Sequence, residues 1–415
     1  MFDQSFTYKT ISSLITKSDF AKNPDLIDKN YKSQIVNSCI EKSLIGFTSS
    51  IDVAVNQFKG KPVYKVKLLQ DELLLRKASE NIKRITSVKQ QDRDSIVNNL
   101  ICFLREGVSY NIYKLDIKSF YESIDTVEML KNMKNDITIS KPTIRVIETI
   151  LKNIDGSGLK GLPRGLQLSA TLSELIMRKF DNYCQKHNDI FFFSRYVDDI
   201  IIITSALEEE SEFINNLETK IYRGLKFNSK KTDIINIPVV NKNDAEKEFE
   251  KFKYLGYEFT IKNPSKKNIR EKYRDVFIDI SSKKVKKIKT RIIRAFLSFC
   301  ENKDYDLLKD RIKLITGNYS IIDRKSGVKR KAGIFYSYNH VSIETSSSIK
   351  DLDIFLKKAL LSRNNKISNE VNNILSLSER RRLLKISFSN GFKRKVFFHF
   401  PQQRLAKIMQ CWAYE

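Results

Sequence analysis

The chain has 415 residues, 41% of them hydrophobic, and a net charge of +26 that comes from 75 Lys and Arg against 49 Asp and Glu. This length is sufficient for two or three domains with hydrophobic cores. Strongly basic chains commonly bind nucleic acid or anionic membranes, but no segment approaches the roughly 20 consecutive apolar residues that a membrane-spanning helix needs. The composition therefore excludes an integral membrane protein and favours a nucleic-acid partner.

Cysteine and histidine are too few and too scattered to form a zinc site. No two cysteines have the spacing of zinc ligands, so a zinc finger or an HNH nuclease is not expected. Scattered cysteines and an N-terminus without a signal-peptide pattern indicate a protein of the reducing cytoplasm. The cysteines are Cys39, Cys102, Cys184, Cys300 and Cys411, and the histidines are His187, His340 and His399.

Residues 1–60 are predicted to be mainly helical and contain no chemical motif. The first strong strand signal follows at residues 113–118, where apolar residues at 113, 115 and 117 alternate with Lys114, Asp116 and Lys118. A period of two is typical of a half-buried strand. We therefore expect Asp116 to lie on the polar face of such a strand.

Apolar side chains recur at helical spacing in residues 168–184 and again after residue 207, up to 221. Between these two segments, Asp198 and Asp199 lie between the apolar runs 191–193 and 200–203. Two adjacent acidic residues are most often a solvated turn. Flanked by two strands, they instead predict a β-hairpin that presents carboxylates, because such groups lose hydration in apolar surroundings and need a compensating cation.

Two strands can bring three carboxylates together. This arrangement suits phosphoryl transfer by two metal ions about 3.5–4 Å apart, one activating the attacking hydroxyl and one stabilising the leaving oxygen. Asp116 and Asp198 are the expected bridging ligands, and Asp199 is the expected supporting ligand. Mg²⁺ is the expected cofactor, with Mn²⁺ as an alternative.

Helices behind a small antiparallel sheet give an α+β pattern. Residues 240–250 are rich in Asn, Asp, Glu and Lys and are predicted to be an exposed connection. The basic excess is concentrated beyond them, since residues 262–415 hold 36 Lys and Arg against 14 Asp and Glu, leaving 39 and 35 in residues 1–261. This distribution predicts a separate region that binds nucleic acid.

One helix of that region carries both an apolar face and a basic stripe. Apolar residues recur at helical spacing through residues 283–297, and the stripe comprises Lys283, Lys287, Arg291 and Arg294. A solvated amphipathic helix is the alternative interpretation. A second basic cluster, residues 380–382 and 393–395, is interleaved with phenylalanines at 388–400, for which we expect core packing, while its basic residues suit phosphate contacts.

Five segments resemble reverse transcriptase motifs A to E in the order that these enzymes have. They read LDIKSFYESID, GLPRGLQLSATLSEL, FSRYVDDIIII, LKFNSKKTDI and KYLGYEF, and they span residues 115–260. The resemblance implies a right-hand polymerase fold, with fingers and palm at 61–260, an N-terminal helical extension at 1–60, and a basic, mainly helical thumb and C-terminal region at 261–415. It also implies an RNA-directed DNA polymerase that adds dNTPs.

The resemblance assigns roles to individual residues. Tyr121 matches the bulky side chain that excludes a ribose 2′-hydroxyl, and Lys231 matches a proton donor to pyrophosphate. Metal binding is implied for Asp116, Ile117, Asp198 and Asp199, and nucleotide binding for Arg76, Arg84, Phe120, Tyr121, Arg164, Gly165 and Ser169. Primer or template binding is implied for Tyr196, Leu255, Gly256 and the stripe residues Lys283, Lys287, Arg291 and Arg294.

The amino-acid sequences of motifs A and C most resemble those of bacterial abortive-infection and defence-associated reverse transcriptases. The C-terminal phrases at 333–338 and 392–400 also resemble that group. Arg164 stands where retroviral-type enzymes have glutamine, which places a fixed charge beside the template path. Template-independent or protein-primed synthesis is therefore an alternative to ordinary copying.

The leading expectation is a bacterial, cytoplasmic reverse transcriptase of an antiphage defence system. Its expected partners are a noncoding RNA template, its DNA product and dNTPs, with a second defence protein or polymerase, or another copy of the chain, as further candidates. A catalytically inactive RNA-binding scaffold is the alternative from a different class, but three retained acidic residues speak against it. An RNA polymerase is disfavoured by Tyr121.

Overall fold

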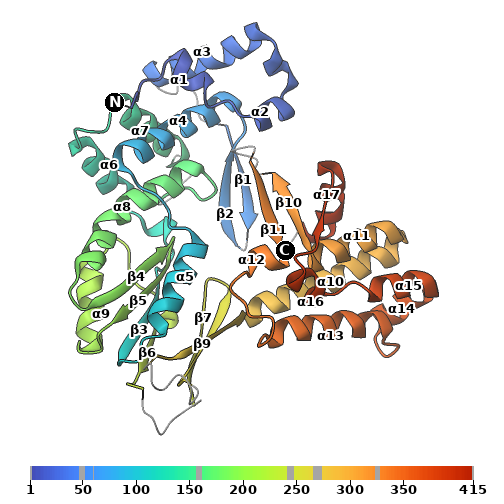
Figure 1. Ribbon diagram of the computed structural model, residues 1–415. Coiled ribbons are helices and arrows are strands. Elements are labelled where there is room, and N and C mark those ends of the chain that lie inside the picture. Colours follow the sequence, from blue (N-terminus) through green and yellow to red (C-terminus); the bar gives the residue numbers. More distant parts are fainter. Residues whose placement is uncertain are drawn as a thin grey trace. The chain divides into compact units, whose positions relative to one another are not determined.

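The computed structural model describes residues 2–45, 52–58, 60–155, 161–240, 247–264, 273–322 and 328–413 (Figure 1). These residues divide into two compact units. The first comprises residues 1–103 and 108–239, and the second comprises residues 104–107 and 240–415. No helix among the described residues is long and apolar enough to span a bilayer.

The first unit begins with short helices and a two-stranded hairpin. Thr7 caps the first helix by accepting a hydrogen bond from the backbone N–H of Thr10, whose side chain bonds back to Thr7, a capping box. The elements are α1 (Tyr8–Ser12), α2 (Lys17–Lys22), η1 (Pro24–Ile27), α3 (Lys29–Ile45), β1 (Val53–Phe58), β2 (Lys61–Val66), α4 (Leu69–Thr86) and α5 (Arg93–Leu104).

A four-stranded antiparallel sheet forms the centre of this unit (Figure 1). Its strands are β3 (Tyr110–Asp116), β4 (Ile190–Tyr196), β5 (Asp199–Thr204) and β6 (Asp233–Ile237), in the order β4-β5-β3-β6. The isoleucine run 200–203 lies in β5, where each residue is at most 1% exposed. Such a continuous apolar run suits a strand that is covered on both faces.

The strand β3 differs from the half-buried strand that its alternating pattern predicts. It is buried along almost its whole length, because Tyr113 and Leu115 lie in the main hydrophobic core and Tyr110 and Ile112, on the opposite face, are buried as well. The polar positions of the pattern are accommodated by pairing. Lys114 donates a hydrogen bond to Asp233 of β6, and Asp116 is 9% exposed at the end of the strand.

Helices cover the sheet as the α+β pattern predicts. The helix α8 (Gln167–Lys186) buries Leu172, Ile176 and Phe180 in the same core as Leu115 of β3 and Ile202 of β5. Burying apolar side chains of this size contributes about 1.5–3 kcal/mol each before conformational entropy is subtracted. The other helices of this part are η2 (Tyr121–Ser123), α6 (Thr126–Asn135), α7 (Lys141–Asp155), α9 (Glu210–Lys220) and η3 (Ser229–Lys231).

The second unit contains two small sheets in addition to the predicted helices. One sheet joins β7 (Glu248–Tyr254), β8 (Tyr257–Lys262) and β9 (Asp275–Ile280), and the other has the order β11-β10-β12. The remaining elements are α10 (Ser282–Asn302), α11 (Tyr305–Thr316), β10 (Asn318–Ile322), β11 (Lys329–Gly333), α12 (Ile334–Ser337), α13 (Ser347–Leu361), α14 (Lys366–Ile374), α15 (Leu377–Leu384), α16 (Phe388–Lys393), β12 (Phe397–Phe398), α17 (Gln402–Met409) and η6 (Gln410–Trp412).

The structure can be compared with several of the sequence predictions for the second unit. The amphipathic helix over 283–297 is confirmed as α10, which buries Val285, Ile292 and Phe296. Core packing is confirmed for Phe388 and Phe392. The predicted exposed connection at 240–250 lies partly outside the described residues, and β7 begins within it.

The boundary between the units lies earlier than the predicted 260/261. In motif E, β7 pairs with β8 and β8 pairs with β9, so both strands of the motif belong to the second unit. Residues 1–60, predicted to be a separate extension, belong to the same unit as the central sheet. The physical reason is that shared hydrogen bonds and a shared core join segments that the sequence presents as consecutive blocks.

Candidate active site

The tip of the hairpin β4–β5 is a two-residue turn. Tyr196 pairs with Asp199 across the hairpin, which leaves Val197 and Asp198 as the turn residues. Val197 has φ of +62°, a conformation that β-branched residues rarely adopt. Positive φ at this position matches the twist of the flanking strands, so the hairpin geometry selects it against the preference of the side chain.

Strand register brings the predicted acidic residues to one end of the sheet. Asp116, the last residue of β3, is the Cα partner of Asp199, the first residue of β5. The backbone N–H of Ile117 donates to the carbonyl of Asp198 at 3.2 Å. Three carboxylates from two chain segments therefore lie at the same sheet end.

Burial and mutual repulsion act on these carboxyl groups. Loss of hydration, followed by the charges of Asp198 and Asp116, raises the pKa of Asp199 to about 6, although the residue keeps an exposed surface. Burial, with a contribution from the Asp116 charge, also raises the pKa of Asp198. Ionising all three groups together is thus unfavourable, and a cation between them would relieve the cost.

The Asp116 carboxylate is held by two side chains that follow β5 in the sequence. Lys231 Nζ lies 2.8 Å from its Oδ1, and Asn228 Nδ2 donates to its Oδ2 at 3.1 Å. The backbone N–H of Asn228 also donates to the Asp116 carbonyl at 2.7 Å. Our sequence analysis missed Asn228, and its only signal was its position in the motif D segment, three residues before Lys231.

The donor set suits a divalent cation, although the side chains are not arranged as a closed metal site. Within the described part of the chain, no three His, Cys, Asp or Glu side chains form a group that could hold a metal ion as they lie. Carboxylate oxygens are the ligands that Mg²⁺ prefers. An ion at Asp116 would compete with Lys231 for this carboxylate, while burial, followed by the charge of neighbouring acidic residues, raises the pKa values of Asp198 and Asp199.

Motif B packs closely against the residues that follow β3. The backbone N–H of Leu162 donates to the carbonyl of Tyr121 at 2.8 Å, and a Cβ at Gly161 would lie 2.2 Å from that oxygen. Gly165 has φ of +94°, and a Cβ there would lie 2.6 Å from the Tyr64 carbonyl. Only glycine fits these approaches without a backbone shift.

Arg164 is paired within the protein. Its guanidinium donates to both carboxylate oxygens of Glu122, at 2.6 and 3.0 Å, and lies 5.4 Å from the centroid of the Tyr121 ring. Lys61 of β2 also lies 3.5 Å from Glu122. Glu122 is a second residue that our sequence analysis gave no role, and it connects the predicted nucleotide residues Tyr121 and Arg164.

Two predicted nucleotide-binding residues are buried. Phe120 is 1% exposed in the main hydrophobic core, and Ser169 is 2% exposed near the start of α8. Core packing accounts for Phe120, which argues against a direct nucleotide contact by its side chain. The prediction for Ser169 stays a prediction.

The predicted fingers residues have contacts of their own. Arg76 of α4 donates to both oxygens of Asp19 at 2.6 and 3.0 Å and to Glu72 at 2.6 Å, so it joins α4 to the N-terminal helices. These ion pairs argue against Arg76 as a nucleotide ligand. Arg84 is exposed, and its guanidinium lies 5.9 Å from the Phe2 ring centroid.

The predicted primer- and template-binding residues fall in both units. Tyr196, in the first unit, ends β4 beside the acidic turn. In the second unit, Leu255 and Gly256 form the β7–β8 turn with φ of +46° and +86°, as a primed two-residue turn requires. On α10, Lys283 and Lys287 are exposed, and Arg291 lies 5.7 Å from the Trp412 ring centroid with Arg294 half-buried.

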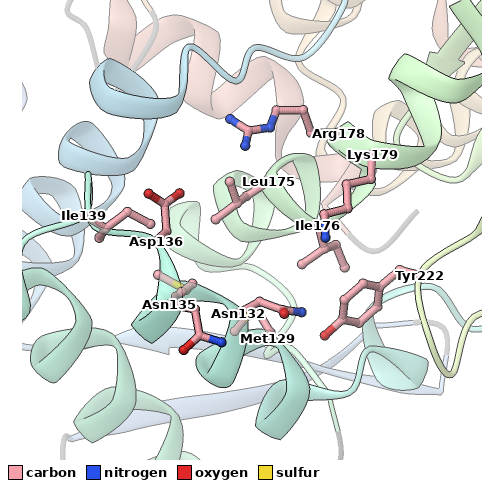
Figure 2. A pocket seen from close by; sticks show the side chains of 11 residues that line it. Met129, Asn132, Asn135, Asp136, Ile139, Leu175, Ile176, Arg178, Lys179 and Tyr222 are labelled. Carbon is pink, nitrogen blue, oxygen red and sulfur yellow. The ribbon is translucent and has the colours of Figure 1, made fainter. Parts of the chain in front are cut away.

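The first unit contains a pocket of about 310 Å³ (Figure 2). Its lining combines Met129 and Ile139 with Asp136, Arg178 and Tyr222. None of the predicted site residues lines it. The hydroxyl of Tyr222, which does line it, donates a hydrogen bond to the Asp125 carbonyl at 2.9 Å. The pocket is therefore not the predicted catalytic centre.

Comparison with known proteins identifies part of the chain. Residues 63–259 match the family model described as "Reverse transcriptase (RNA-dependent DNA polymerase)". This span includes β3, the β4–β5 hairpin, η3 and most of the β7–β8 hairpin. No curated protein matches the chain.

Solved structures with low similarity include three telomerase structures. Apo telomerase from Candida tropicalis, truncated from its C-terminal domain, has 14% identity and a TM-score of 0.33, with 56% of this chain and 58% of that chain covered. Telomerase from Candida tropicalis with a TWJ fragment of telomeric RNA has 13% identity and a TM-score of 0.34, covering 93% and 68%. The Candida albicans complex with the same kind of fragment has 12% identity and a TM-score of 0.34, covering 92% and 65%.

Proposed function

We propose that the chain adds dNTPs at a two-metal site formed by Asp116, Asp198 and Asp199, within the segment that matches the reverse transcriptase (RNA-dependent DNA polymerase) family model. The observation that carries this proposal is the register that pairs Asp116 with Asp199 beside the Val197–Asp198 turn. Carboxylates from two strands at one sheet end suit a nucleotidyltransferase. A binding protein would gain nothing from their mutual repulsion.

The three acidic residues would hold the divalent cations, with Ile117 beside them in the backbone. When bound, such cations activate the primer hydroxyl and stabilise charge on the leaving pyrophosphate. A cation bound by Asp116 would compete with Lys231 for the negative charge of this carboxylate. Lys231, whose Nζ lies 2.8 Å from Asp116 Oδ1, would supply a proton donor and a positive charge near the pyrophosphate.

The residues beside the acidic end of the sheet select the nucleotide substrate. Tyr121 is half-buried, and the nearby Arg164 guanidinium and the Leu162 backbone restrict its position. A fixed ring under the sugar excludes a ribose 2′-hydroxyl by steric clash, which favours deoxynucleotides. Two hydrogen bonds to Glu122 hold the Arg164 guanidinium beside Tyr121, so a contact with the nucleotide or the template phosphates would have to compete with Glu122.

We further propose that this polymerase acts in bacterial antiphage defence, in the bacterial cytoplasm, with an associated noncoding RNA as template. This proposal is supported by the amino-acid sequences of motifs A and C and of the two C-terminal segments 333–338 and 392–400, together with the basic charge of the second unit. Mg²⁺ is the proposed ion, with Mn²⁺ as a substitute. A second defence protein and self-association are compatible with the same activity.

Incorporation of labelled nucleotide tests the proposed polymerase. Purified protein is supplied with labelled dNTPs or NTPs and Mg²⁺, with and without RNA, alongside Asp198→Asn and Asp199→Asn. Asp233→Asn is the matched control, because it removes a carboxylate from β6 of the same sheet without touching the acidic turn. Incorporation of dNTPs that survives in Asp233→Asn and is lost in the other two variants supports the proposal.

Other outcomes separate the alternatives. RNA retention without incorporation under any condition would support an inactive RNA-binding scaffold. Preferential incorporation of NTPs would support an RNA polymerase. Product sequencing distinguishes templated from template-independent synthesis, since only a templated product is complementary to the supplied RNA.

A further inference from the structure

Arg195, two residues before Val197 of the turn, has a side chain 3% exposed and holds a buried ionic network in the first unit. Its guanidinium donates to both oxygens of Asp181, at 2.8 and 2.6 Å, and to both oxygens of Glu174, at 3.3 and 2.7 Å. A fifth hydrogen bond, from Nη1, reaches the carbonyl of Val197 at 3.0 Å. The polymerase mechanism above assigns no role to this network.

These contacts use the full donor capacity of arginine. A guanidinium has five N–H donors in a rigid fork, and the five contacts account for all of them. Lysine has three donors on a flexible stem and could not make the same set. Since Glu174 and Asp181 both lie on α8, the guanidinium fastens one face of that helix to the turn.

The bond to Val197 acts on the strained position. The Val197 carbonyl belongs to the peptide that joins Val197 to Asp198, so its direction sets the path of the backbone into Asp198. With φ of +62° on a β-branched residue, the turn costs energy and persists only where its surroundings hold it. The backbone N–H of Ile117 also anchors this turn, through its hydrogen bond to the Asp198 carbonyl.

We propose that Arg195 is a positioning residue that clamps the Val197 carbonyl to α8 and so keeps Asp198 beside Asp116 for cation binding. The inference rests on the proposed role of the acidic cluster. Gln91 strengthens the clamp from a third segment, because its side-chain oxygen accepts hydrogen bonds from the Ser194 hydroxyl and from the Arg195 backbone N–H. The ionic network of Arg195 thus holds the turn in its strained conformation.

The test compares Arg195→Lys, Val197→Asn and the double variant. Asparagine adopts positive φ readily, so Val197→Asn removes the strain that the clamp must hold. We expect Arg195→Lys to lower kcat about 10–100-fold, in line with the cost of misplacing a catalytic group, while the KM for dNTP stays within about twofold. In the double variant, Val197→Asn should raise kcat at least about tenfold above that of Arg195→Lys alone.

A second readout does not depend on activity. Thermal unfolding of the full chain is followed as Mg²⁺ is titrated, and the midpoint concentration should rise about tenfold in Arg195→Lys and return toward wild type in the double variant. Glu208→Gln is the control for general destabilisation, because Glu208 accepts hydrogen bonds from Asn111, Tyr113 and Thr204, and Thr204 ends β5 at the end opposite Asp199. It should change neither kcat nor the midpoint.

The outcomes are decisive in each case. If Val197→Asn leaves both the kcat and the Mg²⁺ midpoint of Arg195→Lys unchanged, Arg195 is only a packing residue and the inference is overturned. If Arg195→Lys does not fold, Glu174→Gln, which weakens the network but keeps Asp181, must show the same rescue by Val197→Asn. A wild-type chain that binds Mg²⁺ but makes no DNA would overturn the polymerase proposal, and the Mg²⁺ midpoints would still decide the role of Arg195.

Discussion

Lys231 and Asp116 form a direct ion pair, with 2.8 Å between Nζ and Oδ1. The hydrogen bond from Lys231 to Asp116, followed by the charges of the acidic cluster, raises the pKa of Lys231. In the cation-free protein the ammonium group therefore supplies part of the positive charge that the sheet end requires. Cation binding and the Lys231 contact are coupled by this competition for one carboxylate.

Substitution of Lys231 tests this coupling. Lys231→Met should lower kcat about 100-fold, the usual contribution of a positioned proton donor, with little change in the KM for dNTP. The same variant should bind Mg²⁺ at lower concentration, because the ion no longer competes with the ammonium group. Single-turnover incorporation and Mg²⁺ titration measure the two effects.

Lys230→Met is the matched control, because it removes the same positive charge from the exposed residue next to Lys231. It should behave as wild type in both measurements. Equal loss of activity in the two variants would show that general positive charge, and not the Asp116 contact, is what matters.

Tyr121 is expected to control the choice of sugar. Tyr121→Ala should raise incorporation of NTPs relative to dNTPs at least about tenfold, because the side chain that clashes with a 2′-hydroxyl is removed. Tyr121→Phe keeps the ring and should keep the discrimination. Competition between labelled UTP and dTTP gives the ratio directly, and an unchanged ratio in Tyr121→Ala would refute the steric role.

The charge of Asp199 should destabilise the cation-free protein at neutral pH. Its pKa of about 6 in the folded state lies above its ordinary value of 3.8, so ionisation opposes folding above pH 6, and this penalty disappears as the pH falls from 6 toward 4. In EDTA at pH 7.5, Asp199→Asn should therefore unfold at a higher temperature than wild type. The difference should vanish near pH 4.

Added Mg²⁺ should reverse this order. The ion binds the ionised Asp199 of the wild type, and so should raise the unfolding temperature of the wild type more than that of Asp199→Asn. Asp233→Asn again serves as the control within the same sheet. A lower unfolding temperature for Asp199→Asn in EDTA at pH 7.5 would contradict the repulsion that we infer.

The pair of Glu122 with Arg164 should make stability depend on acid pH. Partial burial acts to raise the pKa of Glu122, but hydrogen bonds and charge from Arg164 outweigh it and lower the pKa to about 2, from an ordinary 4.5. Its stabilising contribution is therefore present above pH 4.5 and is lost as the pH falls toward 2. Because both side chains are about one-third exposed, we expect a contribution of only about 1 kcal/mol.

Urea unfolding of wild type and Glu122→Gln measures this contribution. The variant should be less stable at pH 7, and the difference between the two proteins should shrink as the pH is lowered from 4.5 toward 2. A double-mutant cycle with Arg164→Met separates the pair from other effects of each residue. A constant difference across this pH range would rule out the pair as its source.

The exposed stripe on α10 should contribute to nucleic-acid affinity through phosphate contacts. Lys283→Ala and Lys287→Ala should each weaken RNA binding and reduce the slope of log affinity against log salt by about one. Lys357→Ala, an exposed lysine on α13, is the control. Unchanged slopes in both stripe variants would favour the alternative of a merely solvated helix face.

Local patterns in the sequence were sufficient for the principal elements and the order of the acidic residues. A period of two marked β3, and helical spacing marked α8 and α10, because side-chain alternation depends only on nearby residues. Two apolar runs around Asp198 marked a hairpin for the same reason. These signals, together with the ordered motifs, were enough to predict a reverse transcriptase domain, which the family match confirms for residues 63–259.

The partners of the charged side chains were decided only by the tertiary structure. Arg76 looked available for nucleotide but pairs with Asp19, 57 residues away, and Arg195 binds two acids on a helix that precedes it. The burial of β3 likewise comes from the core that packs on its faces, and the positive φ of Val197 comes from the flanking strands. An ion pair depends on which segments pack together, and that choice minimises buried unpaired charge over the whole fold, so no local pattern records it.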